Sequence, residues 1–161
     1  LDYGCGNCIG AHLMHGSFGT SLVAHDKSNL SRVISKSLNL DYTEDPFGAS
    51  RSYDLIYSSH SIEHVPSIKE AFRHFSSALE NGGHLFLEFP NTGNLEIFKV
   101  HKHQPHTYML NLSSIQSIAR KYGFELIYQE TYGPKWSDIY DLGSAAASNI
   151  CTELIVVFKK V

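Results

Sequence analysis

Short apolar runs alternate with segments of helical periodicity from one end of the 161-residue chain to the other. This alternation is typical of α/β proteins that are built on a mostly parallel sheet. One run, Leu154-Ile155-Val156-Val157-Phe158, is continuously apolar, as is expected of a strand covered on both faces. We expect seven strands, at residues 1–3, 21–25, 37–40, 53–58, 84–89, 124–129 and 153–158.

Capping signals mark two of the helices between these strands. A capping box at Ser67-Ile68-Lys69-Glu70 opens a helix with one apolar stripe, and Asn81-Gly82-Gly83 is expected to end it. A second box, Ser113-Ser114-Ile115-Gln116, opens a helix that Gly123 closes. A shorter helix after the second strand is indicated by Leu30, Val33 and Ile34.

Two long connections separate the later elements. Residues 131–152 contain no strong helical pattern, which permits the last strand to run antiparallel to its neighbours. Residues 91–111 form a second irregular stretch, and long loops in compact domains are often functional. We therefore expect residues 91–111 to contribute to a binding site.

A glycine-rich segment, Gly4-Cys5-Gly6-Asn7-Cys8, follows the first strand directly. Glycines at this place allow a sharp turn and a close approach of a ligand to the main chain, although ordinary tight turns carry them too. Asp26 ends the second strand, twenty residues after Gly6. A carboxylate in that position is suited to accept hydrogen bonds from the two hydroxyls of a ribose.

Composition narrows the possible partners and the location. The net charge is −3 and the Lys and Arg residues do not cluster, which disfavours a nucleic-acid groove and an anionic membrane surface. No apolar run approaches the roughly 20 residues of a membrane span, and no signal peptide is visible. Three cysteines make no disulfide framework, so a reducing, cytoplasmic location is expected. Because Leu1 reads as part of a strand already under way, we expect an N-terminal segment to precede it.

The ordered set of motifs resembles the class I S-adenosylmethionine-dependent methyltransferases. The motifs are Leu1-Asp2-Tyr3-Gly4-Cys5-Gly6, His25-Asp26, Asp41 ahead of Pro46-Phe47, Tyr53-Asp54-Leu55-Ile56, Ile62-Glu63-His64-Val65, Asn81-Gly82-Gly83, Phe89-Pro90-Asn91 and Tyr122-Gly123-Phe124. The resemblance covers essentially the whole chain. It implies one domain over residues 1–161 with a Rossmann-like, doubly wound α/β fold, whose seven-stranded sheet is mostly parallel with an antiparallel last strand.

The resemblance also implies S-adenosylmethionine as the cofactor. Glycines of the loop would face its methionine end, Asp26 its ribose, and Asp41 with the main chain of Tyr42 its adenine. Many members of the family carry a third glycine where this chain has Cys8, which puts the geometry of the loop in question. The residues implied in cofactor binding are Asp2, Gly4, Cys5, Gly6, Asp26, Lys27, Asp41, Tyr42, Ser58 and Ser59.

Histidines are the candidates for removing a proton from the methyl acceptor, because their ordinary pKa is near neutrality. We expect His60, His103 or His106 in this role, with Tyr108 positioning the acceptor. The histidine-rich loop that holds the last three of these residues could equally be a solvated polar loop or, less readily, a set of metal ligands; we predict no metal. His64 and Glu63 could be structural at their turn, with Glu63 satisfying nearby main-chain groups.

The acceptor is expected to be a small molecule, such as a sugar, a quinone precursor or another metabolite, and not a nucleic acid or a membrane. The same residues allow a degenerate, non-catalytic binding module. Two other interpretations explain fewer of the motifs. Cys5-Gly6-Asn7-Cys8 is a C-x-x-C pattern of redox or zinc proteins, and a nicotinamide-dependent oxidoreductase would need a glycine at the position of Ile9. The sequence does not specify the oligomeric state.

Overall fold

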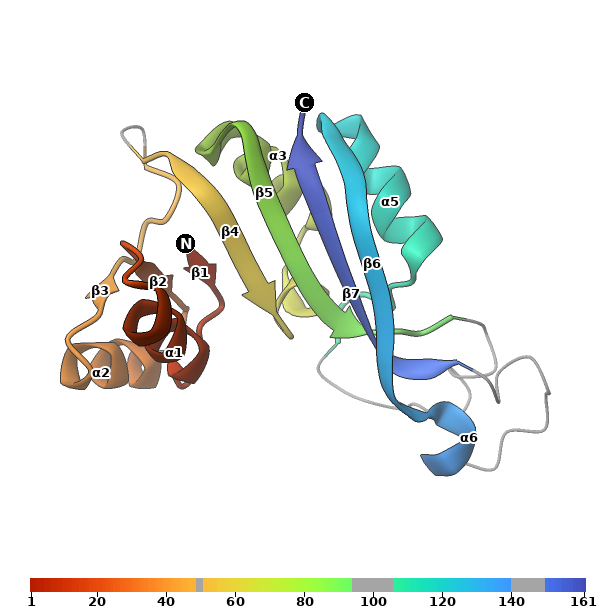
Figure 1. Ribbon diagram of the computed structural model, residues 1–161, viewed down its shortest axis with the longest axis horizontal. Helices are drawn as coiled ribbons and strands as arrows, with labels where there is room; N and C mark the ends of the chain where they lie inside the picture. The colour runs from red at the N-terminus through yellow and green to blue at the C-terminus, as the bar shows by residue number, and fades with distance from the viewer. Residues whose placement is uncertain (49–50, 94–105, 140–149) are drawn as a thin grey trace.

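The computed structural model describes residues 1–48, 51–93, 106–139 and 150–161. One seven-stranded sheet runs through the molecule in the order β3-β2-β1-β4-β5-β7-β6 (Figure 1). Strands β1 to β5 pair in parallel, and β7 runs antiparallel to both β5 and β6. This confirms the predicted fold class. The strands are β1 (Asp2–Tyr3), β2 (Val23–His25), β3 (Asp41–Tyr42), β4 (Tyr53–Ser59), β5 (Leu79–Pro90), β6 (Phe124–Lys135) and β7 (Cys151–Lys160).

Helices lie on both faces of this sheet. Helices α3 and α5 pack behind β5, β6 and β7 (Figure 1). On the other face, α1 lies close to β4: a Cβ atom at Gly10 of α1 would be 3.8 Å from the ring of Tyr57 in β4. Among the residues that the structure describes, no helix is long and apolar enough to cross a bilayer. The helices are α1 (Ile9–Phe18), α2 (Asn29–Ser37), the 3₁₀ turn η1 (Ile62–His64), α3 (Ile68–Ala78), α5 (Leu112–Lys121) and α6 (Trp136–Ile139).

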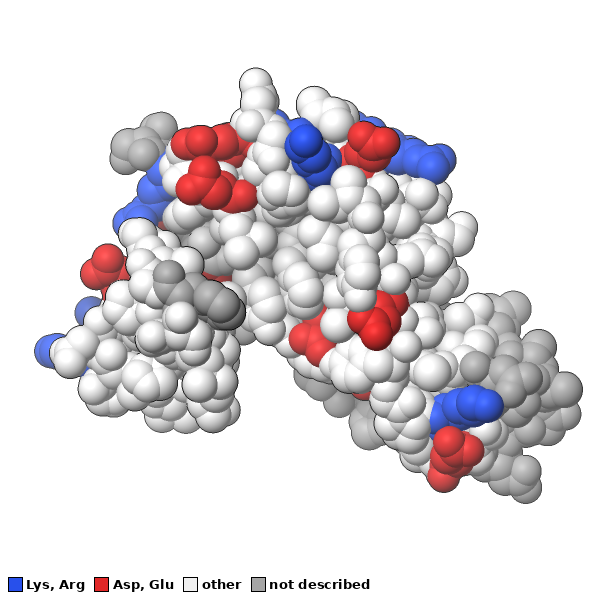
Figure 2. Space-filling view, viewed as in Figure 1, with Lys and Arg blue, Asp and Glu red and all other residues white. Residues whose placement is uncertain are grey.

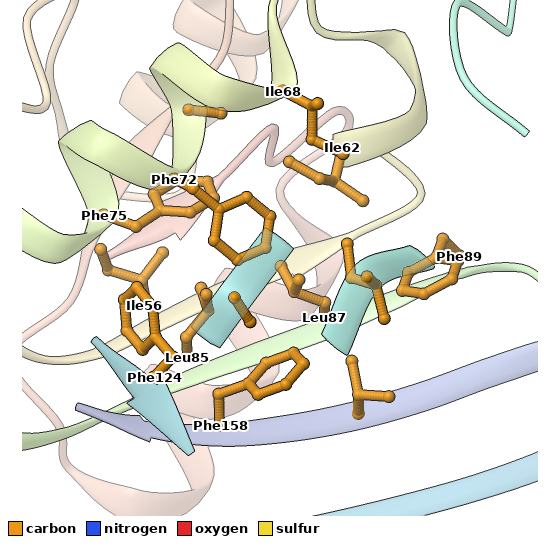
Figure 3. Packing of buried hydrophobic residues seen from close by; sticks show 14 of the residues in the cluster. Ile56, Ile62, Ile68, Phe72, Phe75, Leu85, Leu87, Phe89, Phe124 and Phe158 are labelled. Carbon is orange, nitrogen blue, oxygen red and sulfur yellow. The ribbon is translucent and has the colours of Figure 1, made fainter. Parts of the chain in front are cut away.

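The main core fills the space between α3, α5 and the sheet (Figure 3). Phe72 of α3 is fully buried and meets Phe75 and Phe124 edge to face, at interplanar angles of 65° and 79°. Alternate residues of β5 point into this core because side chains on a strand repeat every second residue. The buried core therefore anchors β4 and β5, whose ends carry the site described below.

Helix α3 begins where its capping box predicts, since Ser67 Oγ accepts a hydrogen bond from Glu70 N at 3.3 Å. Its end was predicted wrongly. The helix stops at Ala78, and Asn81-Gly82-Gly83 belongs to β5. The glycine at position 83 is required for another reason: a Cβ atom there would lie 2.9 Å from Glu80 O and 3.1 Å from Asp54 O of β4.

The region between β2 and β3 departs from prediction. Helix α2 continues through Ser37, and β3 consists of Asp41–Tyr42, so the strand expected at 37–40 is wrong. The apolar residues Leu30 and Val33 are 66% and 65% exposed, whereas Ser31 and Ser35 are buried. Small serines allow α2 to approach the glycine-rich segment, where the Cys8 thiol contacts Ser31 O at 3.6 Å.

The C-terminal third is more regular than expected. Helix α5 is capped by Asn111 instead of Ser113: Asn111 Oδ1 accepts from Ser114 N at 2.9 Å, and Ser114 Oγ accepts from Asn111 N at 3.0 Å. Strand β6 extends to Lys135 and is followed by the short α6, within the connection that was expected to be irregular. The antiparallel β7 is confirmed.

Candidate active site

The strand order reverses between β1 and β4, and open α/β sheets bind ligands at the carboxyl ends of the strands at such a point. Clefts lie on both sides of the glycine loop, defined here as Gly4–Gly6. Gly4, Gly6 and His60 line both clefts. The first cleft is also lined by Tyr3, His25, Asp26, Lys27, Ser61 and His64, and the second by Asp2, Cys5, Asn7, Tyr57 and Ser59.

The glycine loop has a conformation that favours glycine at both ends. Gly4 has φ +82° and Gly6 has φ +51°. The amides of Gly4 and Cys5 both donate to His25 O, at 2.8 and 3.0 Å, which fixes the loop to the end of β2. A Cβ atom at Gly4 would lie 1.9 Å from Ser61 Oγ, whereas one at Gly6 would meet no atom within 4 Å. Gly4 therefore serves close packing, and Gly6 leaves its main chain accessible to a ligand.

Asp26 is held rigidly at the edge of the first cleft. Its Oδ2 accepts from Gly6 N at 2.9 Å, and its Oδ1 accepts from Ser28 N at 2.8 Å. The Tyr42 hydroxyl donates to the main-chain carbonyl of Asp26. Each carboxylate oxygen can accept a further hydrogen bond, so this carboxylate can receive a pair of neighbouring hydroxyls. The structure thus brings together the glycine loop and Asp26, which the sequence places at the ends of two different strands.

Cys8 occupies the position where many members of the family carry a third glycine, and its main chain keeps a conformation that suits glycine. It has φ +59°, the left-handed conformation that a glycine would adopt more easily, and it is fully buried at the start of α1. The path of the chain is therefore compatible with a glycine here. The thiols of Cys5 and Cys8 lie 3.5 Å apart, and burial raises the pKa of both. A reactive C-x-x-C thiol needs a lowered pKa, so these geometries do not favour the redox interpretation.

Of four other residues predicted to bind the cofactor, two line the second cleft and two line neither cleft. Asp2 is buried beside the second cleft, and burial raises the pKa of its carboxyl to about 6. Ser59 lines the same cleft and donates to Glu88 Oε2 at 2.6 Å. Ser58 is fully buried and lines neither cleft. Asp41 is exposed on β3 opposite Val23 and also lines neither cleft.

His60 stands at the junction of the two clefts with a left-handed main chain, φ +48°. Non-glycine residues in this conformation are uncommon and gather at functional sites. His60 N donates to Glu88 O at 2.8 Å. Its Nδ1 lies 3.7 Å from Glu63 Oε1, and its Nε2 lies 3.7 Å from Glu153 Oε2. Glu63 above all, and Glu153 with it, raise the pKa of His60, against the effect of burial.

Three carboxylates around His60 were not identified as site residues. Glu88 comes from β5 and Glu153 from β7, and the Tyr132 hydroxyl of β6 donates to Glu88. A charge within the apolar run Leu87-Glu88-Phe89 was the available signal. The expectation that Glu63 satisfies main-chain groups is wrong: its side chain is 2% exposed, and neither carboxylate oxygen has a hydrogen-bond partner among the residues that the structure describes.

The structure describes part of the histidine-rich loop. His103 and His101 lie outside the described residues, together with most of the loop predicted at 91–111. His106 is described, and its ring lies 4.8 Å from the ring of His64, between centroids. The Tyr108 hydroxyl accepts from Ile68 N at 3.2 Å, at the start of α3, so the structure places it against the main core.

The charge distribution of the face seen in Figure 2 is uneven. Acidic side chains form one group at the upper left and another over the lower ends of the central strands, and Lys and Arg side chains lie along the upper edge and the margins. Within the described residues of this face, the basic side chains form no continuous stripe. Glu88 lies near the end of β5 and Glu153 near the start of β7, which pairs with β5.

Comparison with known proteins agrees with this arrangement. Residues 1–129 match the family described as "Methyltransferase domain". Phosphoethanolamine N-methyltransferase 2 of Caenorhabditis elegans is 29% identical over 91 residues, which cover 55% of this chain and 21% of that protein. The chain thus spans about a fifth of the length of that curated relative.

Solved structures share the fold. A SAM-dependent methyltransferase from Archaeoglobus fulgidus superimposes with a TM-score of 0.78 at 14% identity, over 99% of this chain and 84% of the other. Phosphoethanolamine N-methyltransferase 2 of Haemonchus contortus, in complex with S-adenosyl-L-methionine, gives 0.72 at 21% identity, over 99% and 47%. With the family match over most of its length, this chain belongs to the methyltransferase domain family, among the class I S-adenosylmethionine-dependent methyltransferases.

Proposed function

We propose that this chain binds S-adenosylmethionine and transfers its methyl group to a small-molecule acceptor that carries an amine. The observation that carries the cofactor assignment is the glycine loop tied to the Asp26 carboxylate at the switch point of the sheet. Membership of the methyltransferase family supports the reaction.

The residues of the two clefts fit the groups of this cofactor. Asp26 offers two fixed oxygens to the ribose, and Asp2 offers a buried carboxylate to the amino group of the methionine end. The open main chain at Gly6 allows close contact. In this proposal Tyr42, whose hydroxyl donates to Asp26 O, contacts the adenine. Asp41 is exposed and is not assigned to the adenine. The bound cofactor supplies a methyl group on a positively charged sulfur.

The chain's own contribution is positioning and proton removal. Methyl transfer needs the acceptor atom in line with the breaking bond, and holding it there is the main source of rate. His60, at the junction of the clefts, is the group that takes the acceptor's proton. It replaces the broader set of His60, His103 and His106 predicted from the sequence.

The charges around His60 favour an amine over a neutral hydroxyl. The carboxylates of Glu88 and Glu153 act on it from β5 and β7, and a cationic amine is attracted to such a group of carboxylates before it loses its proton. The similarity to a phosphoethanolamine N-methyltransferase supports the same class of acceptor. A cytoplasmic site of action is part of the proposal, because the three cysteines are free thiols.

An acceptor panel tests the proposal. Formation of S-adenosylhomocysteine is measured with phosphoethanolamine, ethanolamine and sarcosine, and in parallel with a sugar and a quinol. We expect turnover with at least one amine and none with the hydroxyl acceptors. Turnover with a hydroxyl acceptor alone would reject the amine. Tight cofactor binding without turnover on any acceptor would favour the non-catalytic binding module.

A further inference from the structure

We propose that Glu63, His64 and His106 form a binding site for one divalent transition-metal ion of the zinc type. The first observation is the state of Glu63. Its carboxylate is 2% exposed, and within the described part of the chain neither oxygen has a hydrogen-bond partner. A buried carboxylate without a partner is energetically costly, and proteins place such groups beside a cation or a metal.

The imidazole of His60 does not compensate this carboxylate. It lies 3.7 Å from Glu63 Oε1, and also 3.7 Å from Glu153 Oε2 on its other side. Glu153 Oε2 is likewise buried, with no hydrogen-bond partner in residues 1–48, 51–93, 106–139 and 150–161. Even when it holds a proton, His60 carries a single positive charge, so it cannot neutralise two carboxylates. A cation at Glu63 would supply the second charge.

The geometry around Glu63 fits a metal ion. One donor atom from each of Glu63, His64 and His106 can be chosen so that all three lie within 4.8 Å of one another. Glu63 Oε1 is 3.7 Å from His64 Nε2. A tetrahedral ion with bonds of about 2.1 Å holds its ligands about 3.4 Å apart. Small side-chain rotations therefore bring the three donors onto one ion.

The main chain holds the two parts of this site together. Glu63 and His64 belong to η1, and His106 is forty-two residues further along the chain than His64. The amides of Thr107 and Tyr108 both donate to Glu63 O, at 2.8 and 3.0 Å. Since His106 directly precedes these residues, its ring is delivered to η1 by the fold itself.

The donor set selects the class of metal. Two imidazoles and one carboxylate are a zinc-type combination that leaves a fourth position open, whereas Mg²⁺ and Ca²⁺ prefer oxygen ligands. His64 also lines the first cleft, so the fourth position is accessible from the site of the proposed reaction. An oxygen atom of water or of an acceptor is the ligand expected there. The metal site does not depend on the proposed methyl transfer.

Metal titration of the whole chain tests the proposal. The protein is stripped with a chelator and titrated with Co²⁺, followed by visible absorption, and then with Zn²⁺ against a chromophoric chelator. We expect one equivalent of each, with the intense Co²⁺ bands of a tetrahedral site. Loss of a supporting residue around a metal ligand weakens affinity 10- to 100-fold. We therefore expect Glu63→Gln and His106→Ala, which remove ligands, to weaken Zn²⁺ binding about 100-fold or more.

His12→Ala is the matched control, because His12 is exposed on α1, and it should bind Zn²⁺ as the parent does. Circular dichroism and a cofactor titration of each variant show whether it is folded. If Glu63→Gln fails to fold, His106→Ala still tests the site, because His106 is less buried than Glu63. Absence of stoichiometric binding, or equal binding by His106→Ala and His12→Ala, would overturn the proposal. Because cofactor binding is measured separately, failure of the metal site is distinguishable from failure of the proposed function.

Discussion

Gly4→Ala is expected to abolish measurable binding of S-adenosylmethionine and to lower the free energy of unfolding by about 2–5 kcal/mol. The new Cβ atom would lie 1.9 Å from Ser61 Oγ and 2.5 Å from Ser61 Cβ. It would also sit on a residue with φ +82°, a conformation that L side chains rarely adopt. Relief of the clash moves the glycine loop or Ser61, and both border the clefts. Denaturant unfolding and calorimetric titration measure the two effects.

Gly6→Ala shows how much of the loss in Gly4→Ala comes from main-chain strain and how much from the clash with Ser61. Gly6 also has a positive φ, but a Cβ atom there meets nothing within 4 Å, so we expect a loss of only about 1–2 kcal/mol. The double variant Gly4→Ala/Ser61→Gly should recover part of the stability lost in Gly4→Ala, because it removes the clash and leaves the strain. Equal stability of Gly4→Ala and Gly6→Ala would contradict the packing role assigned to Gly4.

His60→Asn is expected to lower kcat by about 10²–10⁴-fold on the accepted amine, the usual contribution of a positioned proton acceptor. Asparagine tolerates the left-handed main chain that His60 adopts, so the turn and its hydrogen bond to Glu88 O should remain. The affinity for S-adenosylmethionine should change by no more than about 3-fold, since Asn removes the base and not the glycine loop.

Steady-state turnover at saturating cofactor measures the effect of His60→Asn, and His12→Asn on the exposed side of α1 serves as its control. An unchanged kcat in His60→Asn would exclude His60 as the proton acceptor. A parallel loss of cofactor affinity and kcat would instead assign His60 to cofactor binding. The two outcomes are distinguished by the titration and the rate together.

The order of the elements was predictable because apolar periodicity reports directly on strands and helices. The long connection before the last strand correctly permitted its antiparallel direction. Local boundaries were less accessible, because they depend on tertiary packing. The helix α2 buries Ser31 and Ser35 and exposes Leu30, which reverses the usual hydrophobic rule. Nothing local in the sequence indicates that Cys8 packs against this helix.

The same distinction applies to the site. The glycine loop, Asp26 and His60 follow strand ends directly, so the topology alone brings them to one edge of the sheet. Glu88 and Glu153 reach His60 from two further strands, and their meeting depends on the register of β5 with β7. Neither spacing nor composition encodes that register. That the buried Glu63 carboxylate accepts no hydrogen bond from the described residues is likewise visible only once the surrounding side chains are placed.

The central claim is that the glycine loop and Asp26 hold S-adenosylmethionine, and calorimetric titration of the cofactor into the whole chain tests it most directly. We predict one site in the parent chain and in Glu44→Ala, which removes an exposed carboxylate paired with Arg32. Asp26→Ala should bind about 10- to 100-fold more weakly, because it loses hydrogen bonds to a charged acceptor. A folded parent chain that binds no S-adenosylmethionine, or an Asp26→Ala variant that binds as tightly as Glu44→Ala, would contradict the account.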